Sequence, residues 1–249
     1  MVLAPQAPSH SASAQISLVT QNLYAGQDVG RTERILAFAD FLQRVRPDVV
    51  AVQELQGWSA RLLAPTLRQL YPHTAHEVTT DNPPWTYVLS RFPRLWRERV
   101  AGIGGWRGME LALLNVSGTP LSVGSAHFRA EDCPRARVPT GAGGQGTTEA
   151  VGAVGDGVLE CPGGDERAAD LRAALQVLKA AGPHECILAG DFNFGLQPHL
   201  FPREVAEMSR HPDFSDAWSA ANRSAGFTWD NTRNRMNKVD VPSLGFNLP

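Results

Sequence analysis

Hydrophobic positions in the N-terminal part of the chain predict alternating strands and helices. The segment 16–23 is predicted to be a first strand that ends in the polar pair Gln21-Asn22, and 48–54 a buried strand that also ends in polar residues. Between them, apolar residues recur at helical spacing over 35–45, and this helix must end before Pro47. A second helical stripe follows over 62–70. This order of elements predicts an α/β fold.

The middle of the chain predicts a run of antiparallel strands. The sequence Gly118-Thr119-Pro120 is expected to form a hairpin turn between the last two of them. A strand–helix–strand unit followed by such a meander indicates a mixed sheet or two packed sheets. The strand-like segments are 73–78, 85–90, 95–103, 109–116 and 121–128.

In the segment 129–164 the apolar residues follow neither the spacing of a helix nor that of a strand, and the segment is rich in Gly, Pro, Thr and Ala. We interpret it as an insertion within one domain, either a substrate lid or a disordered loop. Asp165 is predicted to cap the helix that follows, whose apolar stripe ends near Leu178. The remaining elements are a buried strand over 186–191, a short helix over 204–208, and a loop or short strand over 213–218.

Composition narrows the class of protein. The chain has 249 residues, of which 43% are hydrophobic and 19% charged, as is typical of soluble globular proteins. Its formal net charge of −2 gives no overall signal for nucleic acid or membrane, without excluding a local basic groove. No apolar run approaches the roughly 20 residues of a membrane span. We predict one domain over 15–249, preceded by a disordered tail over 1–14 rather than a signal peptide.

The three cysteines favour a reducing compartment. Cys133, Cys161 and Cys186 match no zinc-binding spacing, and their odd number argues against a disulfide framework. Cys186 lies in an apolar strand and is expected to belong to the core. A bridge between Cys133 and Cys161 is the alternative. The expectation is an intracellular location, in the cytoplasm or the nucleus.

Polar side chains follow four of the strand-like segments, at the point where each strand meets a loop. They are Asn22, Glu54, His127, and Asp191 with Asn193. Ligand sites of layered α/β folds collect at the carboxyl ends of strands. Each residue alone would more often be an ordinary solvated or hydrogen-bonded strand end. Their joint occurrence favours a site, although spacing alone does not identify the reaction.

These residue types suit phosphate chemistry. Glu54 and Asn22 can hold Mg²⁺, which accepts few carboxylates and keeps several waters, and such a metal would polarise a phosphoryl oxygen. Asp191 could orient or deprotonate an attacking water, with Asn193 fixing the phosphate. His127 could donate to a developing negative oxygen or protonate a leaving group.

Five short motifs in order resemble the endonuclease/exonuclease/phosphatase superfamily. They are TQNL at 20–23, VVAVQE at 49–54, LSRFP at 89–93, SAHF at 125–128 and GDFN at 190–193. The resemblance implies a four-layer α/β/β/α sandwich with two mixed, mainly antiparallel sheets. It implies Mg²⁺ or Mn²⁺ and hydrolysis of a phosphate ester by in-line attack of water. It assigns Glu54 and Asn22 to the metal, His127 and Asn193 to the phosphate, and Asp191 to the nucleophile.

A further stretch resembles one branch of this superfamily. FTWD at 227–230, followed by Asn231, is similar to a stretch of the type-2 tyrosyl-DNA phosphodiesterases, which cut 5′-phosphotyrosyl links between DNA and protein. The resemblance implies that Trp229 and Asn231 join Asn193 in substrate binding, and that DNA or a protein–DNA adduct is the partner, as in DNA repair. A packing role for the Trp-Asp pair is the alternative. Another branch would hydrolyse a phospholipid, sphingomyelin or an inositol phosphate.

The C-terminal sequence departs from the family pattern. Members end with an Arg-x-Asp strand and a Ser-Asp-His, whereas this chain ends KVDVPSLGFNLP, in which Asp240 is a candidate remnant of the first motif. We therefore expect the final strand to be missing and an edge of the sheet to be exposed. A truncated chain, a catalytically impaired binding relative, and completion of the site by a neighbouring subunit are the alternatives. Truncation is favoured because the earlier motifs are intact, and reduced activity is expected.

Overall fold

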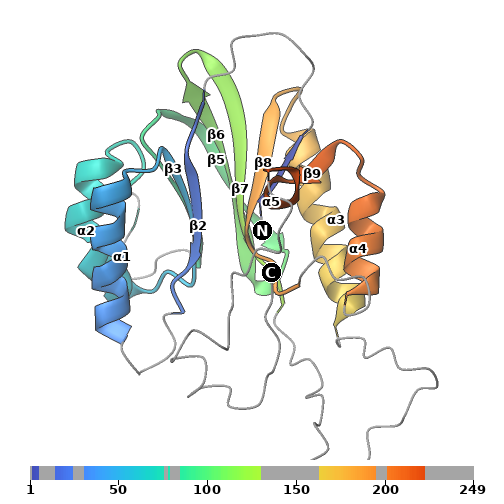
Figure 1. The fold of residues 1–249 in the computed structure, drawn as a ribbon, viewed down its shortest axis with the longest axis horizontal. Coiled ribbons are helices and arrows are strands. Elements are labelled where there is room, and N and C mark those ends of the chain that lie inside the picture. The colour runs from blue at the N-terminus through green and yellow to red at the C-terminus, as the bar shows by residue number, and fades with distance from the viewer. Residues whose placement is uncertain are drawn as a thin grey trace, which may run out of the picture.

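Two β-sheets lie face to face at the centre of the protein, and helices cover the outer face of each (Figure 1). This computed structural model describes residues 2–5, 15–24, 31–75, 78, 85–129, 163–194 and 201–221. The order of the layers is helix, sheet, sheet, helix. The predicted four-layer α/β/β/α sandwich is therefore confirmed, and the fold class is α/β.

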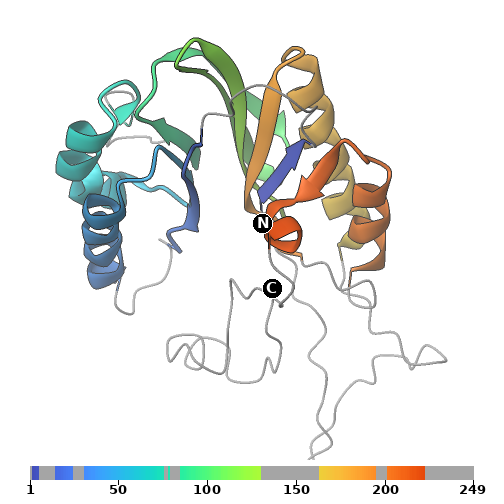
Figure 2. The same ribbon diagram turned by 45° about the horizontal axis from the view of Figure 1, so that its top comes forward.

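The larger sheet has six strands in the order β5-β6-β7-β8-β1-β9. Only β7 and β8 pair in parallel, and the other neighbours are antiparallel, so this sheet is mixed and mainly antiparallel as predicted. Figure 2 shows β1 in dark blue between β8 and β9. The strands are β1 (Val2–Pro5), β5 (Arg94–Gly102), β6 (Gly105–Val116), β7 (Thr119–His127), β8 (Glu185–Asp191) and β9 (Phe214–Asp216).

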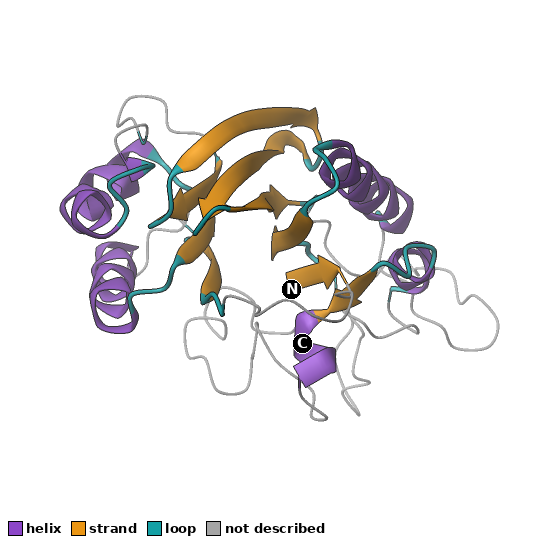
Figure 3. Ribbon diagram, turned by 90° about the horizontal axis from the view of Figure 1, so that it is seen from above, coloured by secondary structure: helices purple, strands orange, loops and turns teal. Residues whose placement is uncertain are grey.

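The smaller sheet has three strands in the order β2-β3-β4, with β2 and β3 parallel and β4 antiparallel to β3. Seen from above, one pair of helices flanks this sheet and a second pair flanks the larger one (Figure 3). The strands are β2 (Leu18–Asn22), β3 (Val49–Gln53) and β4 (Thr86–Ser90). The helices are α1 (Arg31–Val45) and α2 (Gly57–Leu70) on the smaller sheet, α3 (Gly164–Ala180) and α4 (Pro202–Ser209) on the larger one, and the short α5 (Ala217–Ala221).

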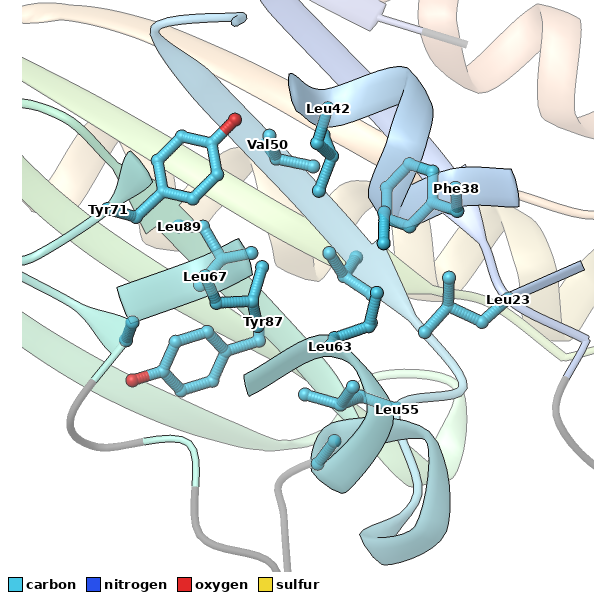
Figure 4. Packing of buried hydrophobic residues seen from close by; sticks show 14 of the residues in the cluster. Leu23, Phe38, Leu42, Val50, Leu55, Leu63, Leu67, Tyr71, Tyr87 and Leu89 are labelled. Carbon is cyan, nitrogen blue, oxygen red and sulfur yellow. The ribbon is translucent and has the colours of Figure 1, made fainter. Parts of the chain in front are cut away.

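Three clusters of apolar side chains hold the helix and sheet layers together. Between the smaller sheet and its helices, Phe38 and Leu42 of α1 and Leu63 of α2 pack against Val50 and Leu89 (Figure 4). A second cluster joins the larger sheet to α3. A third lies between the two sheets. Since β3 is packed on both faces, all its side chains are buried, which explains its continuous apolar run.

Two parallel pairs bring four carboxyl ends of strands together. β2 and β3 are joined through α1, and β8 follows β7 along the chain with α3 between them. Across the gap between the sheets, β2 contacts β8, and β3 contacts β7. Strands that end in Asn22, Gln53, His127 and Asp191 therefore end beside one another. This arrangement positions the site.

Two local predictions are wrong. Residues 71–75 form turns instead of the strand predicted over 73–78, because Thr74 is used to bind β4: its carbonyl accepts the Tyr87 hydroxyl and its Oγ1 accepts the N–H of Ser90. Asp165 does not cap α3, because Gly163 occupies the N-cap in a left-handed conformation and Asp165 lies in the first turn. An acidic residue there still favours the helix dipole.

The predicted hairpin between β6 and β7 is present, but its turn lies one residue earlier than predicted. It runs through Ser117 and Gly118, both with positive φ, whereas Thr119 and Pro120 already pair with β6 as part of β7. Cys186 is buried and free. Burial raises the pKa of its thiol to about 11, which keeps it protonated, as suits a residue of the core.

The ends of the chain are described only in part. The tail expected over 1–14 contains a strand at residues 2–5, since β1 pairs with β8 and β9, and the rest of 1–14 lies outside the described residues. β1 also covers the side of β8 that faces away from β7. Most of the predicted insertion, 130–162, and the region of the final strand, after 221, lie outside the described residues. Within the described part, none of the helices has the length and apolar character needed to span a membrane.

Candidate active site

One amide links the polar strand ends of the two sheets. Asn22 at the end of β2 donates from Nδ2 to Oε1 of Glu54 at 3.0 Å and to Oδ2 of Asp191 at 2.7 Å. Glu54 directly follows β3 of the smaller sheet, whereas Asp191 ends β8 of the larger one. Residues that are far apart in sequence are therefore joined at one end of the sandwich, as the strand-end pattern predicts.

The orientation of Asn22 is set by its other contact. Its Oδ1 accepts the backbone N–H of Tyr24 at 2.8 Å, so its NH₂ group faces the two carboxylates. The carbonyl of Tyr24 in turn accepts the guanidinium of Arg34 at 2.9 Å. Ligation of a metal by Asn22 stays a prediction. Oδ1 has a second lone pair beside the one that accepts the N–H of Tyr24. In the structure, the amide orients Glu54 and Asp191.

Glu54 occupies a strained backbone position. Its φ is +58°, in the left-handed region that glutamate rarely adopts and that costs about 1–3 kcal/mol. Hydrogen bonds hold the chain on both sides: Leu23 N–H to the carbonyl of Gln53 at 3.0 Å, and Leu55 N–H to the carbonyl of Trp85 at 3.2 Å. The strain turns the Glu54 carboxylate toward Asn22 instead of leaving it in line with β3. Such strain is concentrated at functional positions.

His127 is buried beside both carboxylates. Its side chain is 3% exposed, and Nε2 lies 4.0 Å from Oε1 of Glu54 and 3.9 Å from Oδ2 of Asp191. Burial lowers the pKa of the imidazole to about 4, against the raising effect of Asp191 and with a smaller lowering effect from Arg107. Near neutral pH the imidazole is therefore neutral, and these two contacts are not salt bridges.

The GDFN segment is shaped by the neighbouring strand. Gly190 pairs with Ala126, and a Cβ at Gly190 would lie 2.0 Å from the carbonyl oxygen of Ala126, so a side chain does not fit there. Asp191 Oδ1 accepts the N–H of Asn193 at 3.1 Å. Asn193 has φ +52° and donates from Nδ2 to the carbonyl of Phe128 at 2.9 Å. The segment thus turns sharply while both polar side chains stay at the end of β7.

A cluster of three buried phenylalanines packs against the turn of the GDFN segment on its core side. The Phe192 ring stacks on Phe128 at a centroid distance of 4.9 Å, and Phe194 stacks on both. All three are buried. The alternation of the segment therefore places its phenylalanines in the core and its polar residues at the site.

Gln53 makes a polar link between the sheets that sequence reasoning missed. Its Nε2 donates to Oγ1 of Thr20 at 3.3 Å and, across the gap, to Oγ of Ser125 at 3.1 Å. Ser125 donates in turn to the carbonyl of Val52 at 3.1 Å. Gln53 precedes Glu54, and Ser125 lies two residues before His127, so the link lies directly under the site. The signal in the sequence is the polar Gln53 at the end of the apolar run that forms β3.

Replacing Gln53 with methionine is expected to lower the free energy of unfolding by about 1–3 kcal/mol. The change keeps the side-chain volume but leaves the buried hydroxyl of Ser125 and the half-buried hydroxyl of Thr20 without their amide partner. Urea unfolding measures the loss. Gln43→Met is the matched control, since Gln43 is exposed and bonds Thr66 at 3.1 Å. Equal losses in the two variants would show that the buried link adds nothing.

A buried carboxylate, Asp170, and an arginine, Arg129, lie beside the strand ends of the site. Asp170 of α3 is buried, and burial raises its pKa while backbone hydrogen bonds from Gly104 and Arg129 lower it. Arg129 Nε lies 3.9 Å from Oδ2 of Asp170. Gly104 comes so close to the carbonyl of His127 that a Cβ would lie 1.9 Å away. The predicted substrate residues Trp229 and Asn231 lie outside the described residues.

The donor set suits a divalent cation. The carboxylates of Glu54 and Asp191 share the amide of Asn22 and face the neutral imidazole of His127. The side chain of Glu54 is 15% exposed and that of Asp191 is 32% exposed. Two negative charges held together favour a cation between them. Among the described residues no three His, Cys, Asp or Glu side chains form a metal-binding group.

Comparison of the sequence with models of protein families shows to which family the chain belongs. The model of the Endonuclease/Exonuclease/phosphatase family matches residues 19–239. The chain belongs to this family. Its members are hydrolases of the phosphodiesterase and nuclease type. The match spans both sheets, so the endonuclease/exonuclease/phosphatase fold accounts for the layer order and for the position of the site.

Solved structures of the same superfamily share the fold. A humanized D. rerio TDP2 with 14 mutations is 19% identical over 87% of this chain and 77% of its own, with a TM-score of 0.60. A β-hairpin deletion mutant of beta toxin from Staphylococcus aureus is 15% identical over 95% and 85%, with a TM-score of 0.66. Sphingomyelinase C from Streptomyces griseocarneus is 19% identical over 82% and 72%, with a TM-score of 0.57. At these identities the likeness shows the fold alone.

Two further structures carry ligands. One D. rerio TDP2, 19% identical over 88% of this chain and 76% of its own with a TM-score of 0.61, is complexed with a single-strand DNA product. A beta toxin from Staphylococcus aureus, 16% identical over 94% and 81% with a TM-score of 0.66, has bound magnesium ions. A comparison with curated proteins gives no match.

Proposed function

We propose that the protein hydrolyses a phosphate diester with the help of Mg²⁺ or Mn²⁺. One observation carries the proposal: the Asn22 amide joins Glu54 of one sheet to Asp191 of the other, with Nε2 of His127 at 4.0 and 3.9 Å from their oxygens. Membership of the family supports hydrolysis of phosphate esters. The magnesium ions of the related beta toxin support the choice of metal.

The residues divide the work by their chemistry. A bound metal ion would polarise a phosphoryl oxygen and neutralise its charge. Glu54 would hold the metal, and Asn22 keeps the two carboxylates in place. Asp191, fixed by Asn22 and by the N–H of Asn193, orients and deprotonates the attacking water. Asn193 contacts the phosphate, and His127 stabilises negative charge on it.

The reaction balances as a simple hydrolysis. The water oxygen forms a bond to phosphorus, and the bond from phosphorus to the leaving oxygen breaks. One proton of the water passes to Asp191, and Asp191 is regenerated when a proton is returned from it, directly or through solvent, to the leaving oxygen. The products are a phosphate monoester and an alcohol or phenol. No oxidant or further reactant is consumed.

We propose a 5′-phosphotyrosyl or nucleic-acid end as the substrate. FTWD at 227–230 supports this choice, as does the fold shared with TDP2, one structure of which holds a single-strand DNA product. In this proposal Trp229 and Asn231 contact the substrate together with Asn193. A protein–DNA adduct would then be the partner, and an intracellular repair reaction the setting.

A second candidate has its own support. The TM-scores of 0.66 for beta toxin and 0.57 for sphingomyelinase C make a phospholipid, sphingomyelin or inositol phosphate the alternative substrate for the same site. A catalytically impaired binding relative is the third candidate. Substrate assays separate the three.

With Mg²⁺ present, the protein is expected to release tyrosine from a 5′-tyrosyl oligonucleotide. Chelation by EDTA should reduce the rate to background, and excess Mg²⁺ or Mn²⁺ should restore it, because Glu54 and Asp191 are themselves negative and would repel the phosphate without a cation. Chromatography of the cleaved oligonucleotide measures the rate.

A parallel panel contains sphingomyelin and an inositol phosphate. Faster hydrolysis of these substrates would transfer the assignment to the lipid branch. Release that is indifferent to EDTA would contradict the metal. Oligonucleotide binding that survives EDTA, with no hydrolysis of any substrate, would establish the binding relative instead.

A further inference from the structure

A tryptophan bonds the rear nitrogen of the site histidine. Trp85 donates from Nε1 to Nδ1 of His127 at 2.8 Å, and the two rings are nearly coplanar, with an interplanar angle of 9°. The indole nitrogen is a donor and never an acceptor. Nδ1 of His127 must therefore be the acceptor and carry no proton.

This bond decides which nitrogen of His127 carries hydrogen. A neutral imidazole has one N–H, and with Nδ1 occupied as acceptor that hydrogen is on Nε2. Nε2 is the atom that faces Oε1 of Glu54 and Oδ2 of Asp191. A donor, and not a lone pair, therefore points into the site.

We propose that Trp85 is a positioning residue that holds His127 as its neutral Nε2–H tautomer, so that His127 donates a hydrogen bond to the phosphoryl group and does not act as the base. The proposal rests on the proposed function and deepens it. Doubly protonated His127 would direct an N–H at the N–H of Trp85, so the contact opposes that state as well. Proton removal from the attacking water is left to Asp191.

Trp85 is held by the same backbone that holds Glu54. Its carbonyl accepts the N–H of Leu55 at 3.2 Å, and the next residue, Thr86, pairs with Gln53 in the smaller sheet. The indole therefore reaches from the smaller sheet to His127 on the larger one. Any shift between the sheets would change the bond and the position of Glu54 together.

Nuclear magnetic resonance of the imidazole nitrogens tests the tautomer without any catalysis. In protein labelled with ¹⁵N at histidine, long-range proton–nitrogen correlations distinguish the two neutral tautomers and the doubly protonated form. Comparison with His127→Gln assigns the signals. We expect the Nε2–H tautomer for His127 near neutral pH. The Nδ1–H tautomer, or a doubly protonated ring, would overturn the proposal from the wild-type spectrum alone.

Trp85→Phe removes the donor and keeps an aromatic ring. We expect both tautomers of His127 in this variant, and a fall of about 10–100-fold in kcat with KM within about twofold of the wild type. Trp58→Phe is the matched control, since Trp58 Nε1 makes the same kind of bond, at 3.1 Å, to Oε1 of Gln56. It should leave the tautomer and kcat unchanged.

The outcomes separate this inference from the function beneath it. An unchanged tautomer in folded Trp85→Phe protein would overturn the role of Trp85, and thermal unfolding shows that the variant is folded. A fall in kcat without a change of tautomer would do the same, because it would reflect packing. Wild-type protein with the Nε2–H tautomer but without hydrolysis of any phosphodiester would refute the proposed function and leave the contact intact.

Discussion

Asp191→Asn is expected to lower kcat for phosphodiester hydrolysis by about 10²–10⁴-fold. The substitution keeps the shape of the side chain but removes the negative charge, which a general base requires. It also leaves one oxygen where the carboxylate uses two, Oδ1 for the N–H of Asn193 and Oδ2 for the amide of Asn22. Steady-state kinetics with a 5′-tyrosyl oligonucleotide measure the change.

The matched control for this variant is Asp213→Asn. Asp213 is an exposed carboxylate paired with Nζ of Lys179 at 2.8 Å, away from the strand ends of the site. Its loss should leave kcat and KM as in the wild type. An Asp191→Asn variant that kept more than about a tenth of the activity would remove Asp191 from the role of base.

Arg167→Met is expected to lower the free energy of unfolding by about 3–5 kcal/mol. Arg167 of α3 donates from Nε to Oε1 of Glu204 of α4 at 2.7 Å, and both side chains are 1% exposed. Removing the guanidinium leaves a carboxylate without this partner in a region that water does not reach. Urea unfolding followed by circular dichroism gives the difference.

Two companion variants make this prediction specific. Arg167→Met combined with Glu204→Leu should recover most of the loss, because an apolar pair of similar volume carries no desolvation cost. Arg203→Met breaks the ion pair with Asp165, in which both side chains are largely exposed, and should cost less than about 1 kcal/mol. Equal effects at Arg167 and Arg203 would show that burial does not set the strength of the pair.

β3 and β8, which lead to Glu54 and Asp191, could be predicted because apolar side chains pack against both of their faces. The apolar runs that become β3 and β8 are continuous, and each is followed by polar residues at its carboxyl end. Strand direction in a layered α/β fold then places Glu54 and Asp191 at one edge. The bond from Asn22 to Asp191, across 169 positions, follows from this rule and not from local sequence.

Contacts that depend on the docking of two surfaces could not be predicted. The bond from Trp85 to His127 joins positions 42 residues apart in different sheets, so no local pattern of the sequence predicts it. The link from Gln53 to Ser125 has the same origin. The prediction of a strand over 73–78 is wrong because Thr74 bonds to β4 through its carbonyl and hydroxyl groups. The spacing of apolar residues in the sequence gives no sign of these bonds.

The pairing of β1 has a consequence for the synthesis of the protein. Among the described strands β1 is made first, whereas its partners β8 and β9 are made last, with Leu3 opposite both Leu188 and Asp216. Contacts of such high sequence separation form late and slow folding. On the ribosome, residues 2–5 must therefore wait until residue 216 has emerged from the exit tunnel. The smaller sheet, complete at Ser90, can assemble long before the larger sheet closes beside Asp191.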